Sequence, residues 1–227
     1  MVPTLWAREQ NATAMFLENQ AQHSDSFGWI EVITGSMFSG KTEELIRRLK
    51  RAKFAKQKVE IFKPEVDNRY DEDKVVSHDA NEIVSTAVPA AANIRLLADN
   101  CDVVGIDEAQ FFDDEIIAVC NDLANKGIRV IVAGLDMDFK GNPFGPMPQL
   151  MATAEYVTKV HAICTRTGRL ANYSFRKNEN DSLVMLGETE EYEPLSRAAF
   201  YKATVGEKVR AMNVTAEEVV PKKNKKA

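Results

Sequence analysis

Between residues 28 and 163 the chain alternates two patterns of apolar residues. Short runs rich in β-branched residues predict strands, and longer stretches with apolar residues every three or four positions predict amphipathic helices. The predicted strands are Trp29–Thr34, Lys58–Phe62, Asp102–Ile106, Ile128–Ala133 and Tyr156–Ile163. The predicted helices are Thr42–Lys56 and Asp113–Lys126. Strands that alternate with helices predict βαβ units, and therefore an α/β fold with a parallel sheet flanked by helices.

The two ends of the chain differ from this middle part. Residues 1–27 lack the basic and apolar regions of a secretory signal and are predicted to be a partly disordered extension, with a short helix at Met15–Gln22. Met15 is an alternative start of the protein. Residues 204–227 are predicted to be a largely disordered tail, because Pro221–Ala227 holds four Lys in seven residues without an apolar anchor. A role of this tail in nucleic-acid binding or localisation stays open.

Composition excludes several classes of protein. The 227 residues carry 29 Lys and Arg against 34 Asp and Glu, which gives a formal charge of −5. This balance argues against a main role in nucleic-acid binding, and no apolar run approaches the roughly 18 residues of a membrane span. Three cysteines do not suggest a disulfide framework, so we expect a reducing compartment, the cytoplasm. They are Cys101, Cys120 and Cys164.

The strongest chemical motif lies between the first predicted strand and the first predicted helix. It reads GSMFSGKT and matches G-x-x-x-x-G-K-[ST] in full. Its glycines let successive backbone N–H groups turn toward phosphate oxygens, and the helix N-terminus adds a positive dipole end. We expect Lys41 to reach the β- and γ-phosphates of ATP, and Thr42 to provide a hydroxyl to Mg²⁺. The phosphate-binding residues would be Gly35, Ser36, Met37, Phe38, Ser39, Gly40, Lys41 and Thr42.

A second candidate site follows the third predicted strand. Asp107 comes directly after the apolar run, at the position that holds Mg²⁺ in P-loop proteins. Glu108 follows it, and a carboxylate beside the metal can act as general base toward a hydroxyl or a water. The alternative for Glu108 is an exposed acid at the end of a strand. Together the two motifs predict a P-loop kinase or NTPase.

Further motifs narrow this choice. The guanine-specifying N-K-x-D is absent, since residues 125–128 read NKGI. Residues 67–70 read DNRY, 77–81 read SHDAN, 106–112 read IDEAQFF, 133–145 read AGLDMDFKGNPFG and 186–194 read LGETEEYEP. With the P-loop, and in this order from about Gly28 to Lys202, these motifs make the chain resemble the cellular-type, or type II, thymidine kinases.

This resemblance implies a RecA-like P-loop kinase domain at residues 28–160 and a small lasso lobe at residues 161–203. It implies transfer of the ATP γ-phosphoryl group to the 5′-hydroxyl of thymidine, with deoxyuridine as a further substrate, in nucleotide salvage for DNA synthesis. By position, the catalytic residues would be Glu108 as general base, with Arg69 and Lys41. The other nucleotide-binding positions would be Asp67, Asn68, Asp107, Ala109 and Gln110.

The resemblance also places residues around the nucleoside. Four of them lie in or near the motifs above, and the rest belong to the lasso, which would close over the base and exclude water. From the residues alone, Leu170–Arg176 and Ser182–Leu186 predict a hairpin joined by a polar turn. The nucleoside-binding positions would be Met37, Phe111, Leu135, Phe139, Ser174, Leu183, Val184, Met185, Leu186, Gly187 and Tyr192.

The chain departs from this family at the zinc that many members hold with two C-x-x-C pairs. The corresponding positions are Cys164, Thr167, Ser196 and Ala199, so one thiol remains. A structural Zn²⁺ needs four N or S donors in most cases, and His161 adds only one. We therefore expect a lobe that holds no zinc and is stabilised by packing.

The resemblance further implies a homotetramer that is inhibited by thymidine triphosphate. Thymidine and ATP would be the partners, with Mg²⁺ as cofactor and with neither nucleic acid nor membrane. Two alternatives stay open: another P-loop nucleoside kinase or ATPase, and a nucleotide-binding switch without catalysis. An intact Glu108 beside Asp107 argues against the switch, because a sensor needs no base beside the metal.

Overall fold

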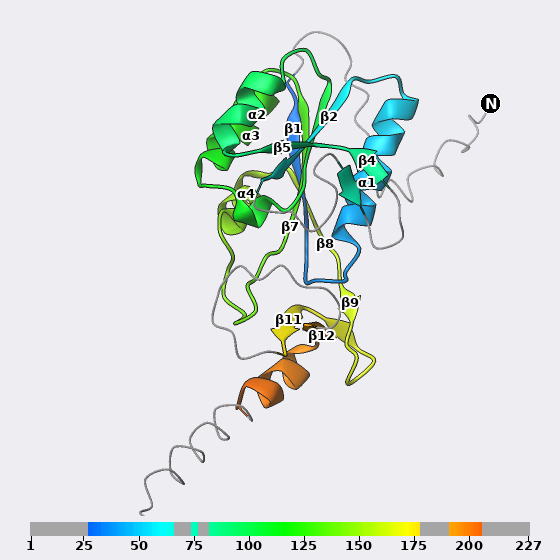
Figure 1. The fold of residues 1–227 in the computed structure, drawn as a ribbon, viewed down its shortest axis with the longest axis vertical. Helices are drawn as coiled ribbons and strands as arrows, with labels where there is room; N and C mark the ends of the chain where they lie inside the picture. Colours follow the sequence, from blue (N-terminus) through cyan, green and yellow to red (C-terminus); the bar gives the residue numbers. More distant parts are fainter. Residues whose placement is uncertain (1–26, 66–73, 77–81, 178–190, 206–227) are drawn as a thin grey trace, which may run out of the picture.

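The computed structural model describes residues 27–65, 74–76, 82–177 and 191–205. Its centre is a six-stranded sheet in the order β5-β2-β6-β7-β1-β8, in which every neighbouring pair is parallel (Figure 1). The predicted α/β fold is therefore confirmed. The strands are β1 (Trp29–Thr34), β2 (Val59–Pro64), β5 (Thr86–Val88), β6 (Val103–Ile106), β7 (Arg129–Gly134) and β8 (Tyr156–Lys159).

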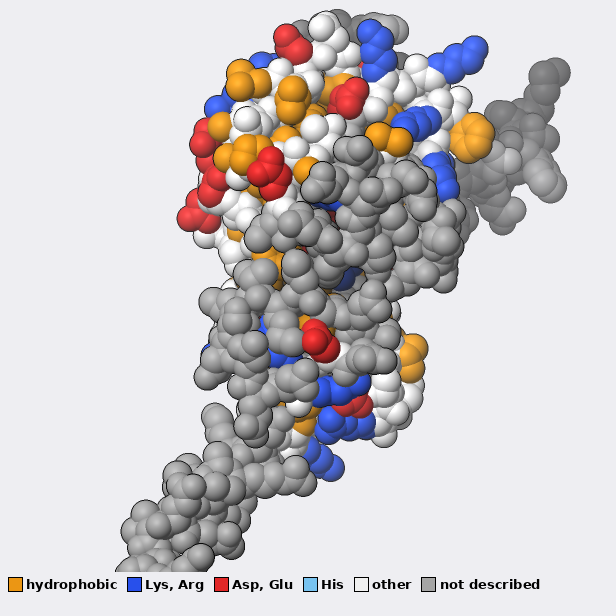
Figure 2. Space-filling model, viewed as in Figure 1, with side chains coloured by type: hydrophobic (Ala, Val, Ile, Leu, Met, Phe, Trp, Pro, Cys, Tyr) orange, Lys and Arg blue, Asp and Glu red, His pale blue; other side chains and the backbone are white. Residues whose placement is uncertain are grey.

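Helices cover both faces of this sheet (Figure 1). On one face α1 (Lys41–Phe54) buries Leu45 and Leu49 against β1, β6 and β7. On the other face α3 (Glu115–Asn125) packs between α2 (Ala91–Leu97) and α4 (Met147–Thr153). Acidic side chains gather over the α2–α3 side, whereas Lys and Arg lie on α1 and on the small lobe (Figure 2). The helices on each face thus bury their apolar stripes against the sheet, which gives three layers: helix, sheet, helices.

The strand order brings three candidate segments to one edge of the sheet. β7 lies between β1 and β6, with Thr34 opposite Gly134 and Ile106 opposite Val132. Since the strands are parallel, the segments that follow them begin at the same edge. These are the P-loop after β1, Asp107 after β6 and Leu135 after β7. Ligands of α/β sheets bind at this carboxyl edge.

A small lobe follows β8 at the same edge (Figure 1). Its strands β9 (Ala162–Ile163) and β10 (Leu170–Ala171) pair with each other, and β11 (Tyr173–Arg176) pairs with β12 (Tyr192–Leu195). Residues 197–205 are helical. The lobe has its own core, formed by Ala162, Cys164, Ala171, Phe175, Leu195 and Ala199.

Two predicted strands are wrong in their extent. Tyr156–Ile163 is not one strand, because the chain leaves β1 after Lys159 and pairs with β10 from Ala162. Leu170–Arg176 is likewise two strands with different partners, β9 and β12, divided at Asn172. The predicted partner Ser182–Leu186 and the helix Met15–Gln22 lie outside the described residues.

Several short elements were not predicted. They are α2, α4, the turn of 3₁₀-helix η1 (Ala109–Phe111), β5, and the antiparallel pair β3 (Lys74–Val76) and β4 (Glu82–Val84). Each has seven residues or fewer, which is too short for a periodic pattern. In the described part of the chain, no helix is long and apolar enough to cross a membrane.

Candidate active site

The P-loop has the backbone that its glycines predict. Gly35 has φ 152°, and a Cβ there would lie 2.2 Å from the carbonyl oxygen of Val160. Gly40 has φ 82° and is the N-cap residue directly before α1. Both positions therefore require glycine, the first because the start of the small lobe passes so close to the loop.

Two side chains follow Gly40 on the first turn of α1. The Lys41 ammonium donates to the carbonyl oxygen of Ser36 at 2.8 Å, which holds its charge over the loop. The Thr42 hydroxyl donates to Asp107 Oδ2 at 3.3 Å, across 65 residues of sequence. The P-loop and the segment after β6 thus meet at this bond.

The Thr42–Asp107 pair fits Mg²⁺. A hydroxyl and a buried carboxylate are hard oxygen donors, and Mg²⁺ in nucleotide sites is held by one or two such groups together with phosphates. The described residues contain no group of three or more His, Cys, Asp and Glu side chains that would form a protein-only metal site. Thr42 and Asp107 are the residues that would hold this ion.

Glu108 sits beside that pair in an unusual backbone conformation. It has φ 50° and ψ 40°, which is uncommon for a residue other than glycine, and it is the N-cap residue directly before η1. Its N–H donates to Asp107 Oδ1 at 2.9 Å, and its carboxylate accepts from Gln110 Nε2. Positive φ values outside glycine cluster at functional sites. Glu108 is therefore built into the site and is not a plain exposed acid.

Gln110 links the segments after β6 and β7. It is buried, and its Oε1 accepts from the N–H of Leu135 at 2.9 Å while its Nε2 donates to Glu108. Ala109 is fully buried in the main core. Gln110 thus orients both Glu108 and the start of the β7 loop, a role that the sequence did not indicate.

The aromatic residues predicted for the nucleoside lie on the β7 loop, on η1 and on the small lobe. Phe111 meets Phe144 edge to face, with ring centroids 5.6 Å apart. The Arg176 guanidinium lies 3.8 Å from the centre of the Phe139 ring and donates twice to Tyr192 Oη. Phe139 and Tyr192 are therefore joined by Arg176, which the prediction missed because a charged residue on a short strand is typical of a surface.

Other predicted site residues fall into two groups. Ser174 is buried on β11, and its hydroxyl accepts from the N–H of Met37 at 2.9 Å, so these two lie together. The remaining predictions concern the phosphate-lining segment and the lasso. They lie outside the described residues and are Asp67, Asn68, Arg69, Leu183, Val184, Met185, Leu186 and Gly187.

At the zinc positions of the resembling family, the lobe holds a hydroxyl–thiol cluster of Cys164, Thr167 and Ser196. Thr167 Oγ1 donates to Ser196 Oγ at 3.3 Å. Burial would raise the pKa of the Cys164 thiol, but hydrogen bonds from Thr167 and Ser196 and from backbone N–H groups lower it to about 6. Ala199, at the fourth position, has no donor side chain. The residues present do not fit a tetrahedral Zn²⁺.

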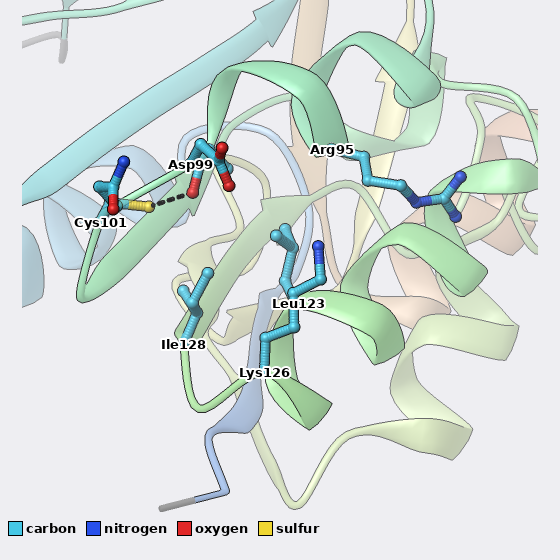
Figure 3. A pocket seen from close by; sticks show the side chains of 8 residues that line it. Arg95, Asp99, Cys101, Leu123, Lys126 and Ile128 are labelled. Carbon is cyan, nitrogen blue, oxygen red and sulfur yellow. Dashed lines mark hydrogen bonds between the residues drawn. The ribbon is translucent and has the colours of Figure 1, made fainter.

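A cavity of about 240 Å³ lies at the opposite edge of the sheet (Figure 3). Its lining comes from the C-terminal ends of α2 and α3 and from the segments before β6 and β7. Cys101 in its wall donates to the carbonyl oxygen of Ala98, and burial raises the pKa of this thiol to about 11. The cavity is separate from the P-loop and holds none of the predicted site residues.

Comparison with known proteins identifies the family of this chain. A family model described as thymidine kinase matches residues 28–200. A thymidine kinase of Bacteroides thetaiotaomicron is 64% identical over 189 residues, which cover 83% of this chain and 95% of that protein. A thymidine kinase of Porphyromonas gingivalis is 60% identical over 192 residues, which cover 84% of this chain and 94% of that protein. The chain therefore belongs to the thymidine kinase family.

Proposed function

We propose that this kinase transfers the γ-phosphoryl group of ATP to the 5′-hydroxyl of thymidine, and to that of deoxyuridine as well. The observation that carries the proposal is the meeting of Thr42 with Asp107 at 3.3 Å, with Glu108 directly beside them. A phosphate-binding loop alone would serve any P-loop protein. A second carboxylate at this point supplies a base for an acceptor hydroxyl.

The residues divide the chemistry between them. The 5′-oxygen forms its bond to the γ-phosphorus as the bond to the β,γ-bridging oxygen breaks, and the 5′-OH proton passes to the Glu108 carboxylate. Lys41 and the loop N–H groups offset the charge that ADP gains. Thr42 and Asp107 would hold Mg²⁺, which would neutralise part of the phosphate charge. Arg69, with Asp67 and Asn68, is proposed to complete the phosphate site on the ground of the family resemblance.

The first test is a product assay with two enzymes. The wild type, ATP and Mg²⁺ are incubated with each nucleoside in turn, and the monophosphate is measured. We expect product from thymidine and from deoxyuridine. Glu108→Gln should lower kcat by about 10²–10⁴-fold, the usual contribution of a general base, while ATP affinity stays the same.

The other outcomes identify the alternatives. Turnover of Glu108→Gln near that of wild type would remove Glu108 as the base. Product only from a different nucleoside, or ATP hydrolysis without any nucleoside product, would indicate another kinase or an ATPase. Nucleotide binding without either reaction would indicate a switch.

We further propose a cytoplasmic homotetramer that is inhibited by thymidine triphosphate and has no zinc in its lobe. The free state of the three cysteines supports a reducing compartment. The resemblance to type II thymidine kinases supports the tetramer and the inhibitor. Light scattering on the purified protein tests the tetramer, and titration of thymidine triphosphate into the product assay tests the inhibition.

A further inference from the structure

Two hydrogen bonds join the P-loop to the small lobe. The N–H of Met37 donates to Ser174 Oγ at 2.9 Å, and the Ser36 hydroxyl donates to the carbonyl oxygen of Ala171 at 3.4 Å. The partners are 137 and 135 residues apart in the sequence. Ser36 and Ser174 are 2% and 4% exposed, so the two hydroxyls are shielded from solvent.

The first bond uses a group that a P-loop ordinarily directs at phosphate. Successive N–H groups of such a loop form a cradle for anions. In this structure the Met37 N–H instead points to a hydroxyl of the lobe, while Lys41 and Gly40 remain on the phosphate side at the start of α1. The middle of the loop is therefore held by the lobe, and its conformation depends on where the lobe sits.

The Ser174 hydroxyl is itself fixed to the body of the lobe. It lies on β11, where it is opposite Pro194 of β12. Its neighbour Tyr173 stacks on Phe200 with ring centroids 4.4 Å apart, and Phe175 meets the same ring edge to face. A displacement of β11 thus carries the lobe core with it and changes the bond to Met37.

We infer that Ser174 is a positioning residue that couples occupancy of the P-loop by nucleotide to the nucleoside affinity of the lobe. The inference rests on the proposed function, which assigns ATP to the loop and thymidine to the lobe. A nucleotide that orders residues 35–42 fixes Met37, and through Ser174 it holds β11 in place for the nucleoside. By linkage, thymidine must raise nucleotide affinity by the same factor. One hydrogen bond of this kind gives a coupling factor of about 2–10.

The experiment measures that factor by calorimetry, without turnover. Thymidine is titrated into wild type, Ser174→Ala, Ser174→Cys and Ser174→Thr, each with and without Mg²⁺ and β,γ-imido-ATP. In wild type we expect the analogue to tighten thymidine binding. Ser174→Ala should reduce the coupling factor to near one, and Ser174→Cys should reduce it with less change of shape. Ser174→Thr keeps a hydroxyl, on a strand that favours β-branched residues, and its coupling factor should stay near that of wild type.

Ser196→Ala is the matched control, because Ser196 is also a buried serine of the lobe and its side chain bonds, among the described residues, to Cys164, Thr167 and Ala199 of the lobe itself. Its coupling factor should equal that of wild type. A factor of one in wild type, or an unchanged factor in both Ser174→Ala and Ser174→Cys, would overturn the inference. Either result leaves the product assay unaffected, so a failed coupling and a failed kinase assignment are distinguishable.

Discussion

At the scale of single residues, Glu108 shows how the site is positioned. Three features place the Glu108 carboxylate beside that of Asp107. They are the left-handed backbone of Glu108, the bond from its N–H to Asp107, and the bond from Gln110 to its carboxylate. The sequence predicted the two acids from their place after an apolar run. It could not predict that Gln110 bridges two loops, since a buried amide in that role has no sequence pattern of its own.

Lys41 offers a sharp test at this scale. Lys41→Ala should weaken ATP binding about 10–100-fold, because a charge-assisted hydrogen bond to phosphate contributes about 1.5–3 kcal/mol. Transfer should fall as well. Calorimetry with ATP measures the affinity.

The control for Lys41 is Lys53→Ala, which removes an exposed ammonium from the last turn of the same helix and should leave ATP affinity unchanged. If Lys41→Ala bound ATP as tightly as wild type, residues 35–42 would not be the phosphate site.

At the scale of elements, the contact between the P-loop and the start of the lobe makes Gly35 irreplaceable. Gly35→Ala would force a Cβ to 2.2 Å from the Val160 oxygen, at a φ that alanine rarely adopts. Overpacking of this kind typically costs about 1–3 kcal/mol of unfolding free energy, and here the backbone that must move is that of the P-loop. We expect a loss of unfolding free energy in urea together with a large loss of nucleotide affinity.

Gly168→Ala is the control that separates the effect of a positive φ from the effect of a steric clash. Gly168 has φ 65°, but a Cβ there has nothing within 4 Å. It should lose about 1 kcal/mol and keep nucleotide binding. Equal effects of the two substitutions on ATP affinity would contradict the proposed role of Gly35.

A buried charge network joins β1, α1 and β7. Glu31 bonds Arg48 at 2.7 Å and Arg129 at 2.6 Å, and it is 6% exposed. Glu31→Gln would remove the carboxylate that pairs with Arg129 and one of the two that pair with Arg48, so we expect a loss of about 3–5 kcal/mol in urea unfolding. Glu115→Gln, whose carboxylate is half exposed beside Arg95, should lose less than about 1 kcal/mol. Similar losses in both variants would argue against the network.

The same network predicts an acid response. Burial acts to raise the pKa of Glu31, but the hydrogen bond and charge of Arg129, with Trp29 and Arg48, outweigh it and lower the pKa below 4.5. The unfolded chain then binds the proton more readily. This contribution to stability is present above pH 4.5 and is lost as the pH falls through the folded-state pKa. In Glu31→Gln the free energy of unfolding should therefore depend less on pH below pH 4.5.

The elements that the sequence predicted share a physical feature. β1, β6 and β7 are buried apolar runs, and α1 and α3 are long enough for their apolar stripe to repeat. The break between β8 and β9 has no corresponding sequence pattern. It arises because β8 pairs with β1 whereas β9 pairs with β10. Arg176 was missed for a related reason: its burial comes from Phe139 and Tyr192, which are distant in sequence.

At the scale of the whole molecule, we expect packing, and not zinc, to stabilise the small lobe. Thr167, Ser196 and Ala199 stand where the resemblance implies thiols in many relatives, and the lobe has an apolar core and the hydroxyl–thiol cluster. We expect purified protein to contain no stoichiometric zinc, and we expect activity to survive dialysis against EDTA once Mg²⁺ is restored. Elemental analysis and the product assay measure this. About one zinc per chain, with activity recovered only by zinc, would contradict it.

The hydroxyl–thiol cluster also has a consequence for how the protein matures in the cell. At these positions an oxidant would meet one thiol, that of Cys164. An enzyme whose lobe holds no zinc, as we expect here, needs no step of metal delivery between folding and activity. The amount of active enzyme would then follow the rate of protein synthesis and would not depend on the zinc supply.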